Sequence, residues 1–358
     1  MPSLKEIKGR INSISSTLAI TSAMKMVAAA KLQKAQMAIQ NMLPYERRLH
    51  SMLIDLMGAM NISAAASEDG SVRGSGSAER GFDQSGDRLS LSNRHDLAGM
   101  DGAYSLMAQR EVRKVAIVAF ASNSSLCGAF NSNAIREATA VINEYRASGL
   151  GDADITVYSV GRKMAEAMKK LGFPSPADFT KMSDSPSYDA ASALAQELLD
   201  GFVSGRFDKV ELVYNHYKST SSQPTIRQTY LPLSLADATA DLQAGKIADS
   251  ASESDTNRGA EPVGAPVVRQ GSPTTEDLIV EPSKEELIAT LLPKVVRLRV
   301  FTTLLDSTAA EQAARTVAMQ LATDNGNDLL QELTLEYNKG RQQKITSEIL
   351  DLVGGSMQ

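Results

Sequence analysis

The sequence predicts an α/β fold attached to a long antiparallel two-helix coiled coil. Two observations lead to this prediction. Apolar side chains recur at helical spacing over many turns near both ends of the chain. The middle of the chain instead alternates short β-branched runs with helical patterns. We therefore expect the N- and C-terminal segments to form the coiled coil, beside a Rossmann-like α/β domain with a largely parallel sheet.

The composition is that of an ordinary globular protein: 358 residues, 42% of them hydrophobic and 22% charged. Tryptophan is absent and aromatic residues make up only 5%, so we expect no nucleic-acid partner that needs a stacking platform. The single Cys127 cannot form an internal disulfide. No apolar run is long enough to cross a bilayer and no secretory signal begins the chain, so we expect it to stay where it is made.

Charge is unevenly distributed along the chain. Residues 1–61 hold eight Lys or Arg against three Asp or Glu, although the whole chain has a net charge of −5. A basic arm on an acidic protein can bind nucleic acid, a membrane surface or an acidic protein partner, and a solvated helix face explains it equally well.

The first expected helix covers residues 3–57, within a predicted N-terminal segment 1–60. Ser3 and Glu6 have the spacing of a capping box, and Pro44 is expected to kink the helix. Alternating steps of four and three residues define a coiled-coil seam. Its apolar members include Ile7, Ile11, Ile14, Leu18, Leu32 and Ile39. Around residues 21–28 a second apolar stripe runs beside the seam, so this stretch is expected to face two surfaces.

The second expected helix covers residues 283–352, within a predicted C-terminal segment 282–358. Ser283 and Glu286 repeat the capping-box spacing, and Gly354-Gly355 is a stop signal. The stretch "TDNGND" at 323–328 is typical of a turn, so the sequence by itself allows a break there.

The predicted α/β domain covers residues 111–235. Its expected strands are 114–120, 154–160, 209–215 and 225–231, and its expected helices are about 132–147, 161–171 and 187–204. Two segments without periodicity flank it. Residues 61–110 are rich in Ser and Gly, and residues 236–281 are acidic, which favours flexible insertions.

A search for catalytic motifs finds little. No phosphate-binding glycine motif follows a strand, the histidines have no metal-ligand spacing, and we expect neither a cofactor nor a metal. The loop "ASNSSLCGAFNSN" at 121–133 holds Cys127 with no nearby base, so packing is favoured over nucleophilic chemistry. There Gly128 is expected to make a tight turn, and Asn131 or Ser132 to cap the following helix.

Long helices without an evident catalytic site favour a mechanical role. The α/β domain joins the end of one helix to the start of the other, so the two helices pair antiparallel and form a stalk. Two alternatives stay open: an α/β enzyme with helical extensions, and a free-standing coiled-coil scaffold.

Several stretches resemble F-type ATP synthase gamma subunits. The resemblance lies in "IKGRINSISSTLAITSAMKMVAAAKLQKAQ" at 7–36 and in the last 45 residues up to Gly355, from "EQAARTVAMQ" to "ITSEILDLVGG". In the middle, "SLCGAFNSN" and "YNHYKSTSSQPTIRQTYLPL" are also similar to the family. Asn123, Ser124 and Ser125 stand where the family usually has Asp-Arg-Gly, and the two insertions exceed the usual family length.

The resemblance implies a central rotor shaft without a catalytic site of its own. This shaft would transmit rotation of the membrane c ring, driven by protons or sodium ions, to the catalytic beta subunits, and it would regulate ATPase activity and ion flow. The implied partners are the alpha, beta and epsilon subunits and the c ring, with delta as a further candidate. The implied location is the cytoplasmic side of a bacterial inner membrane, peripheral to the bilayer through the Fo sector. The resemblance also implies a helix that runs through "TDNGND".

Individual residues receive roles from the resemblance. Met24, Lys25 and Lys31 are expected to face the beta subunits, and Arg341 and Gln342 to form a polar catch with beta. Ile349, Leu352 and Val353 are expected to form an apolar tip inside a sleeve made by the surrounding ring.

Overall fold

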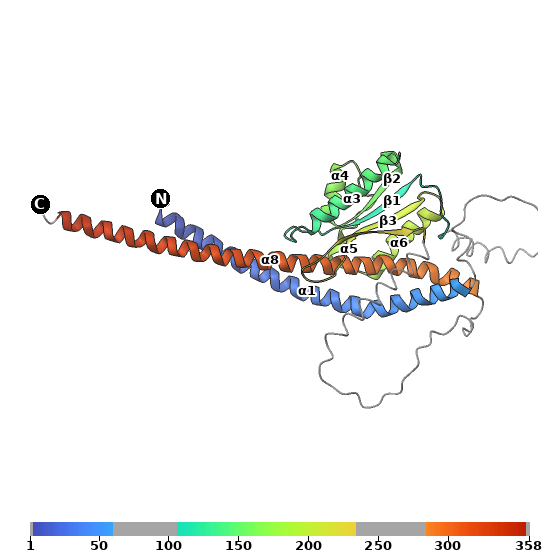
Figure 1. Ribbon diagram of the computed structural model, residues 1–358, viewed down its shortest axis with the longest axis horizontal. Helices are drawn as coiled ribbons and strands as arrows, with labels where there is room; N and C mark the ends of the chain where they lie inside the picture. Colours follow the sequence, from blue (N-terminus) through green and yellow to red (C-terminus); the bar gives the residue numbers. More distant parts are fainter. Residues whose placement is uncertain (1–2, 60–105, 234–283, 356–358) are drawn as a thin grey trace, which may run out of the picture.

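The computed structural model describes residues 3–59, 106–233 and 284–355. Figure 1 shows an α/β domain lying against one part of a long two-helix shaft. The predicted insertions 61–110 and 236–281 fall almost entirely outside the described residues. Their boundaries, and the division of the chain into five segments, therefore stay predictions.

The shaft consists of helices α1 (Leu4–Ala59) and α8 (Lys284–Gly355). They run antiparallel, and α1 continues through Pro44 but changes direction in its second half (Figure 1). At the start of α1, the backbone N–H of Glu6 donates to Ser3 Oγ at 3.2 Å. The Glu6 carboxylate pairs with Arg10 at 2.9 Å instead of reaching back to the cap, so only half of the expected capping box forms. Ser283 lies outside the described residues.

The two helices keep one register over the part of the shaft between the Leu4–Gly340 and Leu18–Gly326 contacts. A side chain added at Gly326 would meet Leu18 Cδ2 at 2.7 Å, and one added at Gly340 would meet Leu4 Cδ2 at 3.2 Å. Leu18 lies fourteen residues after Leu4, and Gly326 lies fourteen residues before Gly340, which is two heptads on each helix. Leucines of α1 therefore pack over glycines of α8 at a heptad interval.

The turn-like stretch 323–328 is helical throughout, as the family resemblance implied. The hydroxyl of Thr323 donates to that of Thr21 on α1 at 3.1 Å, and Gly326 gives Leu18 room to approach. Contact with α1 thus compensates for the low helix propensity of Asn and Gly, which costs roughly 1 kcal/mol at a glycine.

The four strands are β1 (Val115–Phe120), β2 (Ile155–Val160), β3 (Lys209–Asn215) and β4 (Thr225–Leu231). They form one sheet in the order β2-β1-β3-β4, in which β1 pairs in parallel with β2 and β3, and β4 pairs antiparallel with β3. The prediction of a largely parallel sheet is confirmed, and each strand begins within one residue of its expected start.

Helices cover both faces of this sheet (Figure 1). On one face, Ile117 and Val157 pack with α3 (Phe130–Ala147) and α4 (Arg162–Lys170). On the other face, Val118 packs with α6 (Tyr188–Val203) and with the first third of α8. Of these, α3, α4 and α6 were expected as helices of the domain. Two short helices were not: η3 (Asp152–Asp154) and α5 (Thr180–Asp184). The shaft helix α8 is therefore one layer of the α/β domain.

We predict that Gly326→Val destabilises the purified chain by about 1–3 kcal/mol, because the added methyl groups collide with Leu18. Chemical denaturation followed by circular dichroism measures the change. Gly9→Val is the matched control, because a side chain added at Gly9 on the same shaft meets nothing within 4 Å. Adding Leu18→Ala to Gly326→Val should recover part of the loss. Equal effects of the two glycine substitutions would contradict close packing at Gly326.

Candidate functional site

The shaft exposes large apolar side chains that neither helix covers. Ile20, Met26, Val27 and Met37 on α1 are each more than half exposed, as is Leu335 on α8. Isolated exposed apolar residues are common, but a series of them along one rod indicates a surface that contacts other molecules.

The predicted seam residues lie between the helices to different extents. Ile7 and Leu32 are buried, whereas Ile11, Ile14, Leu18 and Ile39 are half-buried. In the second stripe beside the seam, Ile20 and Val27 are 60% and 57% exposed, whereas Met24 is half-buried. The stretch 21–28 therefore faces α8 on one side and solvent on the other.

The residues expected to contact beta subunits lie in two regions of the shaft. Met24 and Lys25 are half-buried and Lys31 is exposed. Arg341 and Gln342 are exposed on α8, close to Gly340, which lies opposite the first turn of α1.

Beyond that point α8 extends past the start of α1 (Figure 1). Ile349, Leu352 and Val353, the residues of the expected tip, are 54%, 74% and 49% exposed. The end of α8 thus presents apolar side chains to solvent, and the structure brings the tip residues onto a different part of the shaft from Met24 and Lys31.

A groove of about 600 Å³ lies where α1 begins. Leu4 and Ile7 contribute apolar surface to it, and Lys5, Lys339 and Lys344 contribute positive charge. Apolar and cationic groups thus meet at the same end of the shaft as the exposed tip.

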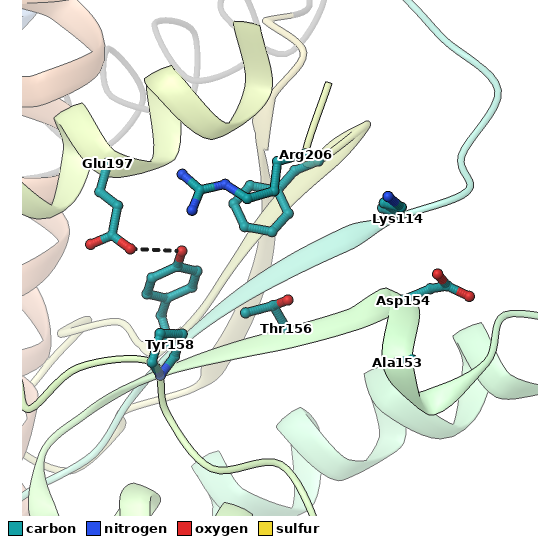
Figure 2. Close-up of a pocket in the computed structure, with 9 residues that line it drawn as sticks. Lys114, Ala153, Asp154, Thr156, Tyr158, Glu197 and Arg206 are labelled. Carbon is teal, nitrogen blue, oxygen red and sulfur yellow. Dashed lines mark hydrogen bonds between the residues drawn. The ribbon is translucent and has the colours of Figure 1, made fainter. Parts of the chain in front are cut away.

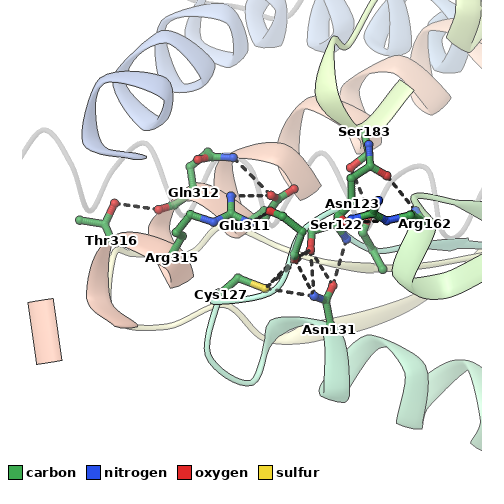
Figure 3. Close-up of polar contacts among 12 residues, drawn as sticks. Ser122, Asn123, Cys127, Asn131, Arg162, Ser183, Glu311, Gln312, Arg315 and Thr316 are labelled. Atoms are coloured by element: carbon green, nitrogen blue, oxygen red, sulfur yellow. Dashed lines mark hydrogen bonds and ion pairs between the residues drawn. The ribbon is translucent and has the colours of Figure 1, made fainter. Parts of the chain in front are cut away.

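The loop after β1 packs against α8 (Figure 3). Cys127 is 1% exposed and packs with Phe130 against Ala310 and Ala314. Gly128 has a φ of 58°, in the left-handed region, so the expected tight turn is present. Cys127 is a packed residue at this contact, in agreement with the sequence-based interpretation.

Asn131 does not cap α3, which corrects the expectation that Asn131 or Ser132 would do so. The helix begins at Phe130 and its N-cap position, Ala129, has no side-chain cap. Instead Asn131 Oδ1 accepts from the backbone N–H of Ser122 at 3.0 Å, and its Nδ2 donates to Cys127 Sγ at 3.1 Å. Because Asn131 lies inside the first turn, its amide reaches back to hold the loop.

A buried ion pair on α8 faces this loop. Arg315 Nη1 lies 2.6 Å from Glu311 Oε1, with both side chains at most 10% exposed, and Arg315 Nη2 donates to Ser124 Oγ at 2.8 Å. Burial raises the pKa of Glu311, although the charges of Arg315 and of Lys31 on α1 act to lower it. The pair connects α8 to the α/β domain, and its field reaches Lys31 on the other helix.

The residues that depart from the family pattern are uncharged and form hydrogen bonds to neighbouring helices. Asn123 Nδ2 donates to the carbonyl of Thr180 at 2.7 Å, and Asn123 Oδ1 accepts from the backbone N–H of Arg162 at 2.8 Å. With Ser124 bound to Arg315, this loop joins α4, α5 and α8 without a charge of its own.

The tip of the β3–β4 hairpin touches both shaft helices. His216 Nδ1 lies 2.6 Å from Asp306 Oδ2, and the backbone N–H of Tyr217 donates to Asp306 Oδ1 at 2.9 Å. The Tyr217 hydroxyl accepts from Gln36 Nε2 on α1 at 2.7 Å. The hydrogen bond to Asp306 raises the pKa of His216, against the smaller effects of burial and of Lys218.

A second, smaller pocket of about 270 Å³ lies between β2 and α6, near the start of β1 (Figure 2). Tyr158 donates to Glu197 Oε1 at 3.1 Å there, and burial together with Glu197 raises the pKa of Tyr158 to about 12. Lys114 and Arg206 supply cations and Asp154 a second carboxylate. With opposite charges in balance, the pocket has no marked preference for an anion or a cation.

Sequence reasoning missed Glu311, Arg315, Asp306 and Tyr217. A local signal existed for the first two, because "AAEQAAR" sets a Glu–Arg pair at i, i+4 among alanines on a helix. Asp306 and Tyr217 had none, because each acts across 89 residues or more of chain.

Within residues 3–59, 106–233 and 284–355, no helix is long and apolar enough to cross a membrane. The same ranges contain no group of three or more His, Cys, Asp or Glu side chains placed to hold a metal ion.

Comparison with known proteins matches residues 3–357 to the family described as ATP synthase. The chain is 46% identical to the ATP synthase gamma chain of Phocaeicola vulgatus and 45% identical to that of Bacteroides thetaiotaomicron, with 100% of each chain covered. The residues of both predicted insertions lie within the matched span.

Among solved structures, a chain of the Euglena gracilis mitochondrial ATP synthase assembly of OSCP, F1 and c ring has a similar fold. Its TM-score is 0.52 at 19% identity, over 99% of this chain and 93% of that one.

Arg315→Met should destabilise the purified chain by about 3–5 kcal/mol, because it leaves the Glu311 carboxylate buried without its partner. Chemical denaturation measures the loss, and adding Glu311→Gln should recover much of it. Arg10→Met is the matched control, since it breaks an i, i+4 Glu–Arg pair of the same spacing that is more than half exposed and contributes about 1 kcal/mol or less. A loss no larger than the control's would contradict a buried, coupled pair.

We also predict that the His216–Asp306 pair stabilises the fold most at low pH. The pKa of His216 is raised in the folded chain, so its contribution is fully present below the unfolded value of about 6.5 and is lost as the pH rises through the folded pKa. Melting temperatures of the wild type and of His216→Gln should therefore converge at high pH. In an Asp306→Asn background the difference between them should no longer depend on pH.

Proposed function

The chain belongs to the ATP synthase gamma chain family, and from this premise we propose that it is the central shaft of an F-type ATP synthase. In this role it transmits rotation of the membrane c ring to the catalytic beta subunits, and it regulates ATPase activity and ion flow. The observation that carries the proposal is the end of α8, where an apolar helix extends past α1 and exposes Ile349, Leu352 and Val353.

The shape of the molecule supports different partners for the shaft and for the α/β domain. The part of the shaft beyond the α/β domain is narrow and exposes apolar side chains from both helices, which suits insertion into a ring of alpha and beta subunits. The α/β domain widens the opposite part of the molecule and suits contact with the c ring, with epsilon beside it and delta as a further candidate.

Chemistry in this complex takes place at the beta subunits, and the gamma chain acts on it mechanically. Met24, Lys25 and Lys31 are proposed to push on an acidic loop of a beta subunit as the shaft turns. Lys31 is exposed and Lys25 half-buried, so water and salt screen their attraction to carboxylates. Weak attraction suits a shaft that has to leave one partner and engage the next.

Arg341 and Gln342 are proposed to form a polar catch with beta. Both side chains are exposed and follow directly after Gly340, where α1 begins to cover α8. Arginine can hold a carboxylate with two parallel hydrogen bonds, and the neighbouring amide can both donate and accept. Ile349, Leu352 and Val353 would then lie in an apolar sleeve of the ring, as a bearing.

The chain is proposed to be a peripheral part of the membrane-bound complex, on the cytoplasmic side of a bacterial inner membrane. The relatives of highest identity given above are bacterial gamma chains, which supports this location. Copurification with alpha and beta subunits from membranes tests the assignment. A chain that instead binds nucleotide alone, or forms a stable homodimer, would favour the enzyme or the scaffold alternative.

We predict that Arg341→Ala with Gln342→Ala lowers ATP synthesis by the assembled complex severalfold, because the polar catch with beta is lost, while the chain stays folded. Synthesis in membrane vesicles, normalised to the amount of assembled complex, measures the effect. The matched control is Arg136→Ala with Glu137→Ala, an adjacent pair on α3 of the α/β domain. Normal synthesis by the first double variant would remove both residues from the coupling role.

A further inference from the structure

The hairpin tip at His216 and Tyr217 holds the α/β domain to the two shaft helices at the same level. Asp306 on α8 receives two contacts from it, one from the His216 ring and one from the Tyr217 backbone N–H. The Tyr217 hydroxyl accepts from Gln36 on α1. The Tyr217 side chain also packs against two apolar clusters. One contains Leu32 of α1 with Ala309 of α8, and the other contains Cys127 with Ala310 of α8.

The tip is itself firmly attached to the domain. Asn215, 1% exposed, donates to the carbonyl of Phe130 at 3.1 Å and accepts from the Thr225 hydroxyl at 2.6 Å. The backbone N–H of His216 donates to the carbonyl of Pro224 at 2.8 Å. When the sheet or α3 moves, the hairpin tip therefore moves with it.

The surface that α8 presents here is largely apolar, apart from the hydrogen bond that Arg315 Nη2 donates to Ser124 Oγ. Alanines occupy positions 309, 310, 313 and 314, and the cluster contacts around them are apolar. Apolar packing is non-directional, so it holds two surfaces together without fixing their sideways position. Hydrogen bonds depend on direction and weaken steeply when misaligned, more so when a charged group takes part. Arg315 forms a directional contact between α8 and the domain, but the hairpin tip forms such contacts with both α8 and α1.

We propose that the hairpin tip, with Asp306 as its positioning residue, transfers torque from the α/β domain to both helices of the shaft. The proposal rests on the rotor function proposed above. Rotation of the domain about the shaft axis pulls on Asp306 through two contacts and on Gln36 through one, so α8 and α1 turn together. Without the tip, the domain could turn against the shaft under load before the shaft moves, and part of the rotation would be lost as slip.

The competing explanation is that the large apolar interface of α8 with α6 and the sheet transmits all of the torque. That interface includes Ile288 and Leu292 of α8 and Leu194 and Leu198 of α6. In that case the tip would only add stability. The two explanations differ in what happens under load.

The experiment uses the complete complex with substitutions in this chain. Asp306→Ala removes both acceptors at once, whereas Asp306→Asn keeps an acceptor oxygen for Tyr217. Two activities are measured per assembled complex: ATP synthesis in vesicles, which needs torque from the domain, and ATP hydrolysis by the detached catalytic sector, in which the shaft turns without load. Arg146→Ala, which breaks the Arg146–Asp152 pair on the far side of the domain, is the control.

We expect Asp306→Ala to lower synthesis at least threefold and to leave unloaded hydrolysis within about twofold of wild type. Asp306→Asn should retain most of the synthesis rate, and Arg146→Ala all of it. Unchanged synthesis in Asp306→Ala, or an equal fall in both activities, would overturn the proposal.

A second variant keeps the proposal testable if Asp306→Ala does not fold. Tyr217→Phe with Gln36→Leu removes only the contact to α1, and it should widen the angular fluctuations of the domain about a stalled shaft by about twofold. Unchanged fluctuations would also overturn the proposal. If the proposed rotor function itself were wrong, the result would be different. The wild-type chain would then not restore ATP synthesis to membranes that lack this chain.

Discussion

The antiparallel pairing of α1 and α8 in one register is the constraint on which the rest of this structure depends. Leucines of α1 meet glycines of α8 at a two-heptad interval, and Thr21 bonds Thr323 within the same register. This pairing keeps α8 helical through a turn-like sequence. It also determines where α1 begins along α8, and so how much of α8 extends alone with its apolar side chains exposed.

The same helix also completes the α/β domain. Along its first third α8 covers one face of the sheet with α6, and farther along it receives the loops that follow β1 and β3. Because parallel strands end at the same edge of a sheet, these loops reach α8 close together. Shaft and domain therefore share a core, and a displacement of one is felt directly by the other through the buried Arg315 and through Asp306.

Stability and function make opposite demands on the shaft surface. Lys25 lies half-buried in the seam where an apolar residue would pack better, and Ile20 and Val27 expose most of their area to water. A coiled coil selected only for stability would avoid both. In a shaft that contacts several partners in turn, exposed apolar area and screened positive charge provide contacts that form and break with each step of rotation.

The sequence by itself determined the elements of this protein. The four-three spacing from Ile7 onward, the β-branched runs and the small-residue loop around Cys127 are local patterns, so both long helices, the four strands and the tight turn at Gly128 could be predicted from them. Tertiary structure decided what depends on distant pairing. Local propensity left a break at Asn325-Gly326 open, and only the approach of Leu18 explains the continuous helix physically. Asp306 and Tyr217 carry no mark in the sequence, because a contact between residues so far apart along the chain is set by how the sheet and the shaft pack.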